Sequence, residues 1–300
     1  EVIALQAQRE TEPYPGLTYD SEGFPDLDAV FVEWRWSTYK NSGPDKFEPD
    51  LDRQMALLDH YSNEVPTIVW DTDLKMTPDD EVRWPNMIVA DPTFKPNEFS
   101  LKRHVLPFWS DFKPMLPAAQ DPVEYGYVGN NYERRQMFQK YYSSAAKGLR
   151  VQGVQTKVHG NWLQRSPERQ SPESLIQLHS DVAFGPRVGF KESMGLLNSF
   201  ICTAHITKPG YAKQGFASPR YLENIIMNTP ALVPGEFLIP DLLGSYWTVN
   251  STTDVIKKVT ELKNMTAYER ETIVLEQKAA LLHHHDFSVD AVCNFIEDKV

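Results

Sequence analysis

The chain of 300 residues is long enough for one large domain or two medium ones, each with its own core. It contains no run of about eighteen apolar residues, which excludes a membrane-spanning helix, and its two cysteines, Cys202 and Cys293, exclude a disulfide framework and favour a reducing cytoplasm. The net charge of −11 falls entirely in residues 1–115, with 22 acidic against 11 basic side chains, so any contact with nucleic acid would need a local basic patch.

The first part of the chain alternates apolar runs with amphipathic segments. It opens directly in an apolar run, Glu1–Leu5, without an initiating Met, so we expect a preceding strand–helix unit to be missing. Continuous apolar strands between helices are typical of a parallel, Rossmann-like sheet. The expected strands are 29–36, 66–73 and 86–91, and the expected helices are 51–61 and 79–83.

Acidic side chains lie toward the carboxyl ends of two of these strands. Glu33 lies in the first strand, and Asp71 and Asp73 end the second. Because ligands of parallel sheets bind beyond the carboxyl ends of the strands, these three acids are candidates for proton transfer. Their ordinary role at a strand end would be solvation or helix capping, and an Asp-x-Asp pair such as Asp71 and Asp73 is also a weak signal for a metal ion.

A proline-rich stretch, Pro107–Pro122, has no sustained period and marks the expected domain boundary, which we place between residues 1–115 and 116–300. The second part again alternates strands with helices, which predicts a second Rossmann-like domain. Three helices are expected from about residue 254 to the end. The other expected elements are strands at 124–128, 156–162, 182–188 and 200–206, and helices at 135–147 and 191–198.

Several strands of this second part end in residues that suit phosphate or sugar. Gly129 opens the turn after one strand, and Arg134 follows in the approach to a helix, so that backbone amides and a guanidinium could hold a diphosphate. Arg187, after a Gly-Pro pair, is a further phosphate candidate. His159 and His205 end two other strands and could hydrogen-bond a sugar or a leaving phosphate. Each also has an ordinary interpretation, either as a solvated cation or as a satisfied structural histidine.

The most informative stretch lies between residues 215 and 236. Ser218 can cap a helix whose first position is Pro219, because proline there loses no bonded N–H and has its φ preset. The free amides and the positive dipole end of such a helix attract phosphate. Arg220 and Glu223, three residues apart, share one helical face, so a cation and a carboxylate would line the same pocket.

This stretch resembles the donor-site helix of the GT-B glycosyltransferases. The resemblance rests on Gly-Phe at 215, Ser-Pro-Arg at 218, Glu223, Thr-Pro at 229 and the apolar strand that follows, and it is closest to the spore-maturation-like and bacteriophage-type members. The Tyr-Val-Gly-Asn sequence ending at Asn130 is similar to the first strand and turn of the family's donor domain. The resemblance covers about residues 124–245, and Gly215 stands where the better-known form has a second Glu.

The resemblance implies an α/β fold of two Rossmann-like domains with C-terminal helices, and an enzyme that moves a sugar from a nucleoside diphosphate, such as a UDP-sugar, to an acceptor hydroxyl. Glu223 would hold the ribose, while Arg220, Arg134 and the helix start at Ser218 would face the diphosphate. The first domain would bind the acceptor, with Glu33, Asp71 or Asp73 as the base. No metal or other cofactor is expected, because the helix dipole and the arginines can stabilise the leaving group.

The acceptor remains open at this point. The bacteriophage-type relatives imply a hydroxymethylated pyrimidine in DNA, which must be flipped out of its stack, whereas the acidic first half favours a small metabolite, a glycan or a protein hydroxyl. A nucleotide-binding protein without turnover is an alternative, because Gly215 replaces a carboxylate. A metal-dependent GT-A enzyme using Asp71 and Asp73 is another.

Overall fold

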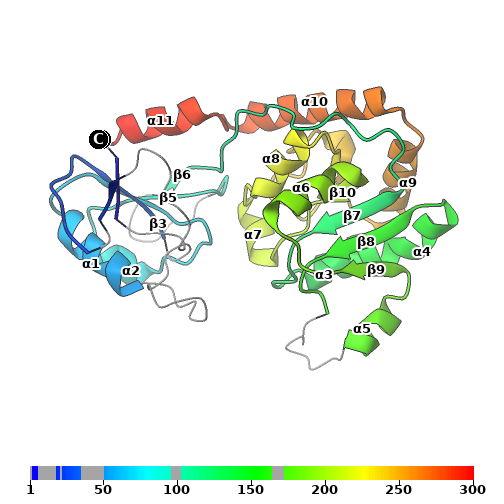
Figure 1. Ribbon diagram of the computed structural model, residues 1–300, viewed down its shortest axis with the longest axis horizontal. Helices are drawn as coiled ribbons and strands as arrows, with labels where there is room; N and C mark the ends of the chain where they lie inside the picture. Colours follow the sequence, from blue (N-terminus) through cyan, green and yellow to red (C-terminus); the bar gives the residue numbers. More distant parts are fainter. Residues whose placement is uncertain (1, 6–17, 21, 35–50, 96–102, 164–171) are drawn as a thin grey trace. The chain divides into compact units, whose positions relative to one another are not determined.

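The computed structural model describes residues 2–5, 18–20, 22–34, 51–95, 103–163 and 172–300 (Figure 1). The chain forms two compact units. Unit 1 comprises residues 1–107 together with 290–300, and unit 2 comprises residues 108–289. Unit 2 thus begins at the start of the proline-rich stretch, and the end of the chain groups with unit 1.

Unit 1 is built on a parallel sheet. Its elements are β1 (Ile3–Ala4), β2 (Thr18–Tyr19), β3 (Val30–Glu33), α1 (Leu51–Tyr61), β4 (Thr67–Trp70), α2 (Pro78–Arg83), β5 (Ile88–Asp91), β6 (His104–Val105) and most of α11 (Val289–Glu297). The four-stranded sheet has the order β3-β4-β5-β6, and β4 is buried at every position, as its unbroken apolar run requires. Trp34 and Trp84 pack edge to face at 5.8 Å in its core.

Unit 2 contains the second sheet and most of the helices. Its elements are β7 (Glu124–Val128), α3 (Arg135–Phe138), the π-helical turn η1 (Gln139–Ser143), α4 (Ser144–Val151), β8 (Gln155–His159), α5 (Pro172–Leu178), β9 (Val182–Gly185), α6 (Phe190–Ser199), β10 (Phe200–Ala204), α7 (Pro209–Gln214), α8 (Pro219–Ile226), β11 (Ala231–Pro234), the 3-10 turn η2 (Ser245–Trp247), β12 (Thr248–Val249), α9 (Thr252–Lys263) and α10 (Ala267–His284).

The strand order of this sheet fixes where a ligand can bind. The order is β12-β11-β10-β7-β8-β9, and all neighbours are parallel (Figure 1). Counted along the chain, this is the Rossmann order 3-2-1-4-5-6, in which the direction of winding reverses between the first strand, β7, and the fourth, β10. Ligands of such sheets bind beyond the carboxyl ends of the strands at this switch point, here just after Val128 and Ala204.

The predicted α/β class with two parallel sheets is confirmed, and the tail contains the three expected helices α9, α10 and α11. Several bounds differ: β4 ends at Trp70, β9 at Gly185 and β10 at Ala204, each earlier than expected. The strand expected at 156–162 ends at His159, the helix expected at 135–147 contains the π turn η1, and the strand expected at 29–36 ends at Glu33, with residues 35 and 36 outside the described part. Among the described residues, no helix has the length and apolar character needed to cross a membrane.

Candidate functional site

The helix α8 begins as its sequence predicts. Ser218 has extended backbone angles, and its Oγ accepts the backbone N–H of Arg220 at 3.3 Å, while Pro219 occupies the first helical position. Leu222 and Ile225 are buried and hold the helix against the rest of unit 2. Along the chain, α8 follows β10 and α7, and its first turn lies beyond the carboxyl end of β10.

Arg220 and Glu223 form an ion pair on one face of α8. Their side chains retain 30% and 14% of their exposure, so the carboxylate is turned away from bulk solvent and the guanidinium is partly accessible. A partly accessible guanidinium beside a helix start can hold a phosphate oxygen, and a sheltered carboxylate can accept hydrogen bonds from sugar hydroxyls.

His205 follows β10 directly and contacts α8. Its ring stacks on that of Tyr221 with centroids 3.8 Å apart, and burial lowers the pKa of His205 to about 3. The positive charges of Arg134 and Arg220 act on this pKa in the same direction. The structure thus packs His205, at the end of β10, against α8, the helix that carries Arg220 and Glu223.

The Gly129 turn is clamped against the turn after β8. The Gly129 N–H donates to the His159 carbonyl at 2.9 Å, and Gly160 approaches so closely that a Cβ there would lie 2.2 Å from the Gly129 carbonyl oxygen. Two reciprocal bonds join the same turns, because Asn161 accepts the Asn131 N–H at 2.8 Å and donates its own N–H to Asn130 at 3.1 Å. These turns are rigid before any ligand binds.

Several buried polar atoms at this edge have no hydrogen-bond partner among the described residues. They are Asn131 Oδ1, Arg134 Nε and His205 Nε2. An unsatisfied buried group costs about 1–3 kcal/mol, and either water or a polar ligand can supply the missing partner. Burial, with the charge of Lys157, also lowers the pKa of His159, so the imidazole is neutral and can both donate and accept.

For two further residues predicted for this site, Gly215 and Arg187, the structure gives the local surroundings only. Gly215 ends α7 with left-handed backbone angles, φ 69° and ψ 48°, which explains why a glycine rather than a glutamate occupies this position. Arg187 follows β9 and is exposed. Neither residue is seen in contact with the group at the switch point, so their binding roles stay predictions.

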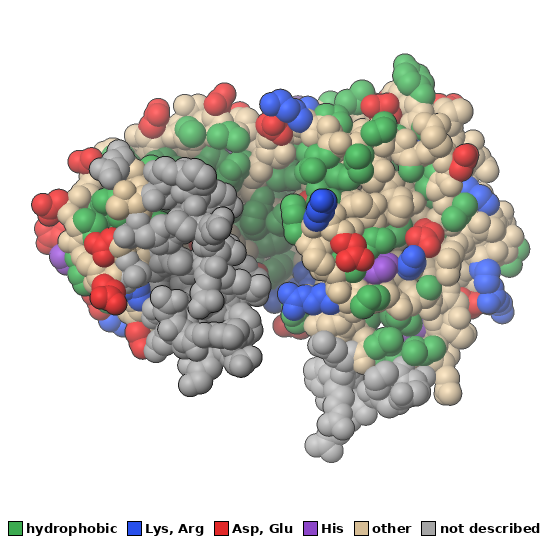
Figure 2. Space-filling view, in the orientation of Figure 1, with side chains coloured by type: hydrophobic (Ala, Val, Ile, Leu, Met, Phe, Trp, Pro, Cys, Tyr) green, Lys and Arg blue, Asp and Glu red, His purple; other side chains and the backbone are tan. Residues whose placement is uncertain are grey.

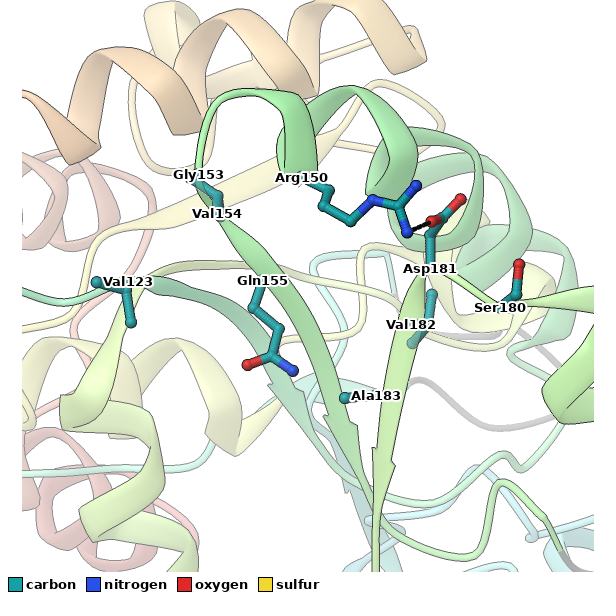
Figure 3. Close-up of a pocket in the computed structure, with 9 residues that line it drawn as sticks. All are labelled: Val123, Arg150, Gly153, Val154, Gln155, Ser180, Asp181, Val182 and Ala183. Atoms are coloured by element: carbon teal, nitrogen blue, oxygen red, sulfur yellow. Dashed lines mark ion pairs between the residues drawn. The ribbon is translucent and has the colours of Figure 1, made fainter.

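A surface pocket in unit 2 lies at the other edge of the same sheet (Figure 3). It is lined by residues at the amino ends of β7, β8 and β9, among them Val123, Gln155 and Val182. Arg150 and Asp181 form an ion pair of 2.6 Å beside it. None of the predicted site residues lines this pocket.

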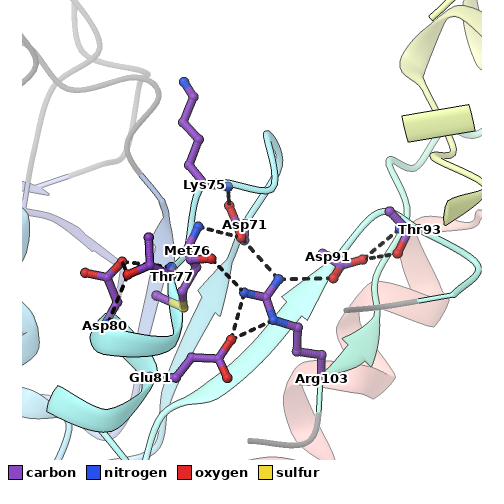
Figure 4. Close-up of polar contacts among 9 residues, drawn as sticks. All are labelled: Asp71, Lys75, Met76, Thr77, Asp80, Glu81, Asp91, Thr93 and Arg103. Atoms are coloured by element: carbon purple, nitrogen blue, oxygen red, sulfur yellow. Dashed lines mark hydrogen bonds and ion pairs between the residues drawn. The ribbon is translucent and has the colours of Figure 1, made fainter. Parts of the chain in front are cut away.

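The carboxyl edge of unit 1 is organised by Arg103 (Figure 4). Its guanidinium lies 3.2 Å from Asp71, 2.8 Å from Glu81 and 3.3 Å from Asp91, and all four side chains are fully buried. Asp71 also accepts the backbone N–H groups of Lys75 at 2.7 Å and Met76 at 2.9 Å. Burial raises the pKa of Asp71 and of Asp91, against the lowering effect of the hydrogen bonds and of Arg103.

The three acids predicted as bases in unit 1 therefore have different surroundings. Asp71 belongs to the buried Arg103 cluster, where its oxygens are occupied. Asp73 is 30% exposed in an ion pair of 3.0 Å with Lys75, and Glu33 is partly buried and accepts the Thr72 hydroxyl at 3.3 Å. The tight turn that follows Asp73 includes Leu74 at φ 52°, a conformation that non-glycine residues rarely adopt. Among the described residues, no group of three or more potential metal ligands is found.

Sequence reasoning missed the residues that act through long-range contacts. Arg103 stands 32 residues after Asp71 and 12 after Asp91, and no local pattern links them. Asn131 belongs to the Gly-Asn-Asn turn, in which the sequence pointed only to Gly129 and Arg134 as candidates for diphosphate binding. A second asparagine directly after a glycine turn was the signal that could have pointed to it.

The architecture defines the class of fold. Two Rossmann-like α/β units and a long C-terminal helix are those of the GT-B glycosyltransferases, which confirms the predicted fold. No protein-family model and no curated protein sequence matches the chain.

Three solved structures illustrate the likeness. T4 phage β-glucosyltransferase in complex with its UDP-glucose substrate matches with a TM-score of 0.58 at 14% identity, over 94% of this chain and 84% of that chain. A Thermobaculum terrenum O-GlcNAc transferase mutant matches with 0.51 at 12% identity, over 91% and 66%. S. aureus TarM in complex with UDP and other ligands matches with 0.50 at 10% identity, over 85% and 47%. At these identities the likeness shows the fold alone.

Proposed function

We propose that this protein is a glycosyltransferase that uses a UDP-sugar as donor and transfers the sugar to an acceptor hydroxyl. The observation that carries the proposal is the packing of His205, at the carboxyl end of β10, on Tyr221 of α8, the helix that begins at Ser218 and carries the Arg220–Glu223 pair. Buried polar atoms of Arg134 and His205 at the same edge have no partner among the described residues. The resemblance in fold to T4 phage β-glucosyltransferase, whose solved structure contains UDP-glucose, agrees with this ligand class.

Unit 2 would bind the donor. The diphosphate would lie against the first turn of α8 at Ser218, with Arg220 and Arg134 neutralising its charge. Positive charge fixed at this position stabilises the nucleoside diphosphate as it leaves, which is where negative charge develops in the transition state. Glu223 would accept hydrogen bonds from the ribose hydroxyls, and the neutral His159 and His205 would bond sugar hydroxyls or phosphate oxygens.

Unit 1 would supply the base that takes the proton from the acceptor hydroxyl. Asp73 and Glu33 are the better candidates because each keeps a partly exposed carboxylate, whereas Asp71 is occupied within the Arg103 cluster. A positioned base typically contributes on the order of 10²–10⁴ in rate. We expect Asp73→Asn or Glu33→Gln to lower kcat by about that factor while leaving UDP affinity unchanged.

The acceptor class follows less directly. β-Glucosyltransferase is described as a DNA-modifying enzyme, and a hydroxymethylated pyrimidine in DNA is therefore one proposed acceptor. The surplus of acidic residues in 1–115 favours an uncharged or basic acceptor instead, such as a small metabolite, a glycan or a protein hydroxyl. On the visible face of unit 2, basic and acidic side chains interleave, so this face offers no broad basic surface (Figure 2).

The donor assignment is tested by changing one residue of the protein and one group of the ligand, separately and together. UDP and its 2′,3′-dideoxy form are titrated calorimetrically into the wild type and into Glu223→Ala. The wild type should prefer UDP by about ten- to a hundredfold, and the variant should lose this preference, because hydrogen bonds to a charged group contribute about 1.5–3 kcal/mol. Glu276→Ala, at an exposed acid on α10, is the matched control and should keep the preference.

Three further results would redirect the proposal. Full ribose discrimination in Glu223→Ala would remove Glu223 from the site. Absence of both transfer and donor hydrolysis, with UDP binding intact, would leave a nucleotide-binding protein without turnover. Loss of activity in chelator would show that the transfer needs a divalent metal ion, contrary to the expectation for this site. Hydroxymethylated duplex DNA assayed beside glycan and peptide acceptors, with a panel of labelled sugar nucleotides, identifies the acceptor class.

A further inference from the structure

The two strands that flank the switch point of unit 2 separate before they reach it. β7 and β10 pair only at Glu124 with Phe200 and at Tyr125 with Cys202, and the register shifts between these pairs. By contrast, β7 and β8 stay paired through their last residues, Val128 and His159. The sheet is therefore split along the line that leads to the candidate site.

The hydroxyl of Tyr142 fills this split. It accepts the Ala204 N–H at 2.7 Å and lies within donating distance of the carbonyl oxygens of Ala204, at 2.8 Å, and Gly126, at 3.0 Å. One side-chain oxygen thus bonds backbone groups of β7 and of β10, where adjacent strands would otherwise bond each other. Tyr142 is fully buried, so these backbone groups have no water to replace the hydroxyl.

The π turn η1 delivers this side chain. Tyr141 and Tyr142 are consecutive and both are fully buried. π turns within helices are rare and recur at functional sites. Arg134, the residue before α3, begins the same helical segment, so one continuous element joins the split to the candidate diphosphate site.

We infer that Tyr142 is a positioning residue for the donor site: its hydroxyl holds β7 and β10 apart, so that the Gly129 turn and His205 flank an open crevice. This inference rests on the proposed function for its ligand, a nucleoside diphosphate. The hydroxyl of Tyr142 bonds backbone groups of β7 and β10, and it acts on the ligand through the placement of the two turns.

The experiment compares Tyr142→Phe with Tyr125→Phe, using UDP as the probe. Tyr125 is equally buried, its ring stacks on that of Tyr142 at 4.5 Å, and its hydroxyl donates to the Tyr141 carbonyl at 3.1 Å, which belongs to neither β7 nor β10. Both variants should lower Tm. Only Tyr142→Phe should weaken UDP binding, by about tenfold or more, because small displacements of positioning groups have large effects on a bound ligand. Equal UDP affinity in the wild type and both variants overturns the inference.

A second measurement does not depend on the nucleotide. Hydrogen exchange of the backbone amides should be faster in Tyr142→Phe at residues 128–131 and 204–206, and unchanged there in Tyr125→Phe. If the wild type fails to bind UDP, the proposed function fails, and the exchange result still decides whether Tyr142 sets the split. Unchanged exchange in both segments overturns the inference on this measurement too.

Discussion

The carboxyl edges of the two sheets carry similar kinds of side chain and satisfy them in different ways. In unit 1, Arg103 is surrounded by Asp71, Glu81 and Asp91, all four side chains are fully buried, and each carboxylate pairs with the Arg103 guanidinium. In unit 2, the polar groups at the edge include buried atoms of Arg134 and His205 that lack partners among the described residues.

We interpret this difference as one of role: the Arg103 cluster supports the fold, and the polar groups of unit 2 are proposed to bind a ligand. A buried network is stable only when its members satisfy each other, and the Arg103 cluster does so without anything added. The edge of unit 2 bears a cost that the native chain does not recover by itself. A ligand with acceptors for the arginine and with mixed donors and acceptors for the histidines would recover it.

The largest effect is expected from breaking the Arg103 cluster at the carboxyl edge of unit 1. Arg103→Met would leave three carboxylates buried without a cation and should lower the free energy of unfolding by about 3–5 kcal/mol. Arg83→Met is the control, because Arg83 pairs with Asp59 at 2.7 Å on the surface and should cost at most about 1 kcal/mol. Urea denaturation measures both. Similar losses in the two variants would contradict the structural role of the cluster.

The next largest effect is expected on UDP affinity, from a change at the carboxyl edge of the unit 2 sheet. Arg220→Met should weaken UDP binding by about ten- to a hundredfold, through the loss of charge-assisted bonds to the diphosphate. Arg150→Met removes an equal charge at the opposite edge of the same sheet, where Arg150 pairs with Asp181, and should leave UDP affinity unchanged. Calorimetric titration gives both constants. A loss shared by the two variants would indicate a general charge effect.

The pH dependence of stability should differ between the two edges. The pKa of His205 is about 3 when folded and 6.5 in its ordinary range, so below pH 6.5 the unfolded chain takes up a proton that the folded chain refuses. Stability is thus lost as pH falls, by about 2 kcal/mol at pH 5. Asp71 and Asp91 act in the opposite direction, because their raised pKa values let the folded state hold protons longer.

The contribution of His205 to the pH dependence of stability is obtained by comparing the wild type with a variant that lacks the imidazole. Unfolding of the wild type and of His205→Gln is measured at pH 7.5 and pH 5, and the two carboxylates contribute equally to both proteins. The variant should lose about 2 kcal/mol less than the wild type over this interval. An identical loss in both proteins would show that the imidazole takes its proton within the fold.

The sequence predicted those features that depend on neighbours along the chain. Ser218, Pro219 and the apolar residues of α8 specify a helix start locally, and the apolar runs specify the strands. The Arg103 cluster and the backbone contacts of Tyr142 could not be predicted, because their partners lie 12 to 62 residues away along the chain and meet only when the sheets form. The π turn was hidden as well, since its residues have the pattern of an ordinary helix.

The smallest effect tests the helix starts of the two units. In unit 1, Thr77 and Asp80 form a reciprocal capping box on α2, whereas in unit 2 Ser218 alone caps α8. Thr77→Ala and Ser218→Ala should each cost about 1 kcal/mol of stability, because each leaves a first-turn amide without its acceptor. Only Ser218→Ala should also change UDP affinity, and by no more than about threefold, since the amides of α8 and not the hydroxyl are proposed to face the diphosphate. A much larger loss of affinity in Ser218→Ala would place the hydroxyl itself on the phosphate, and an equal change in Thr77→Ala would remove the distinction between the two helix starts.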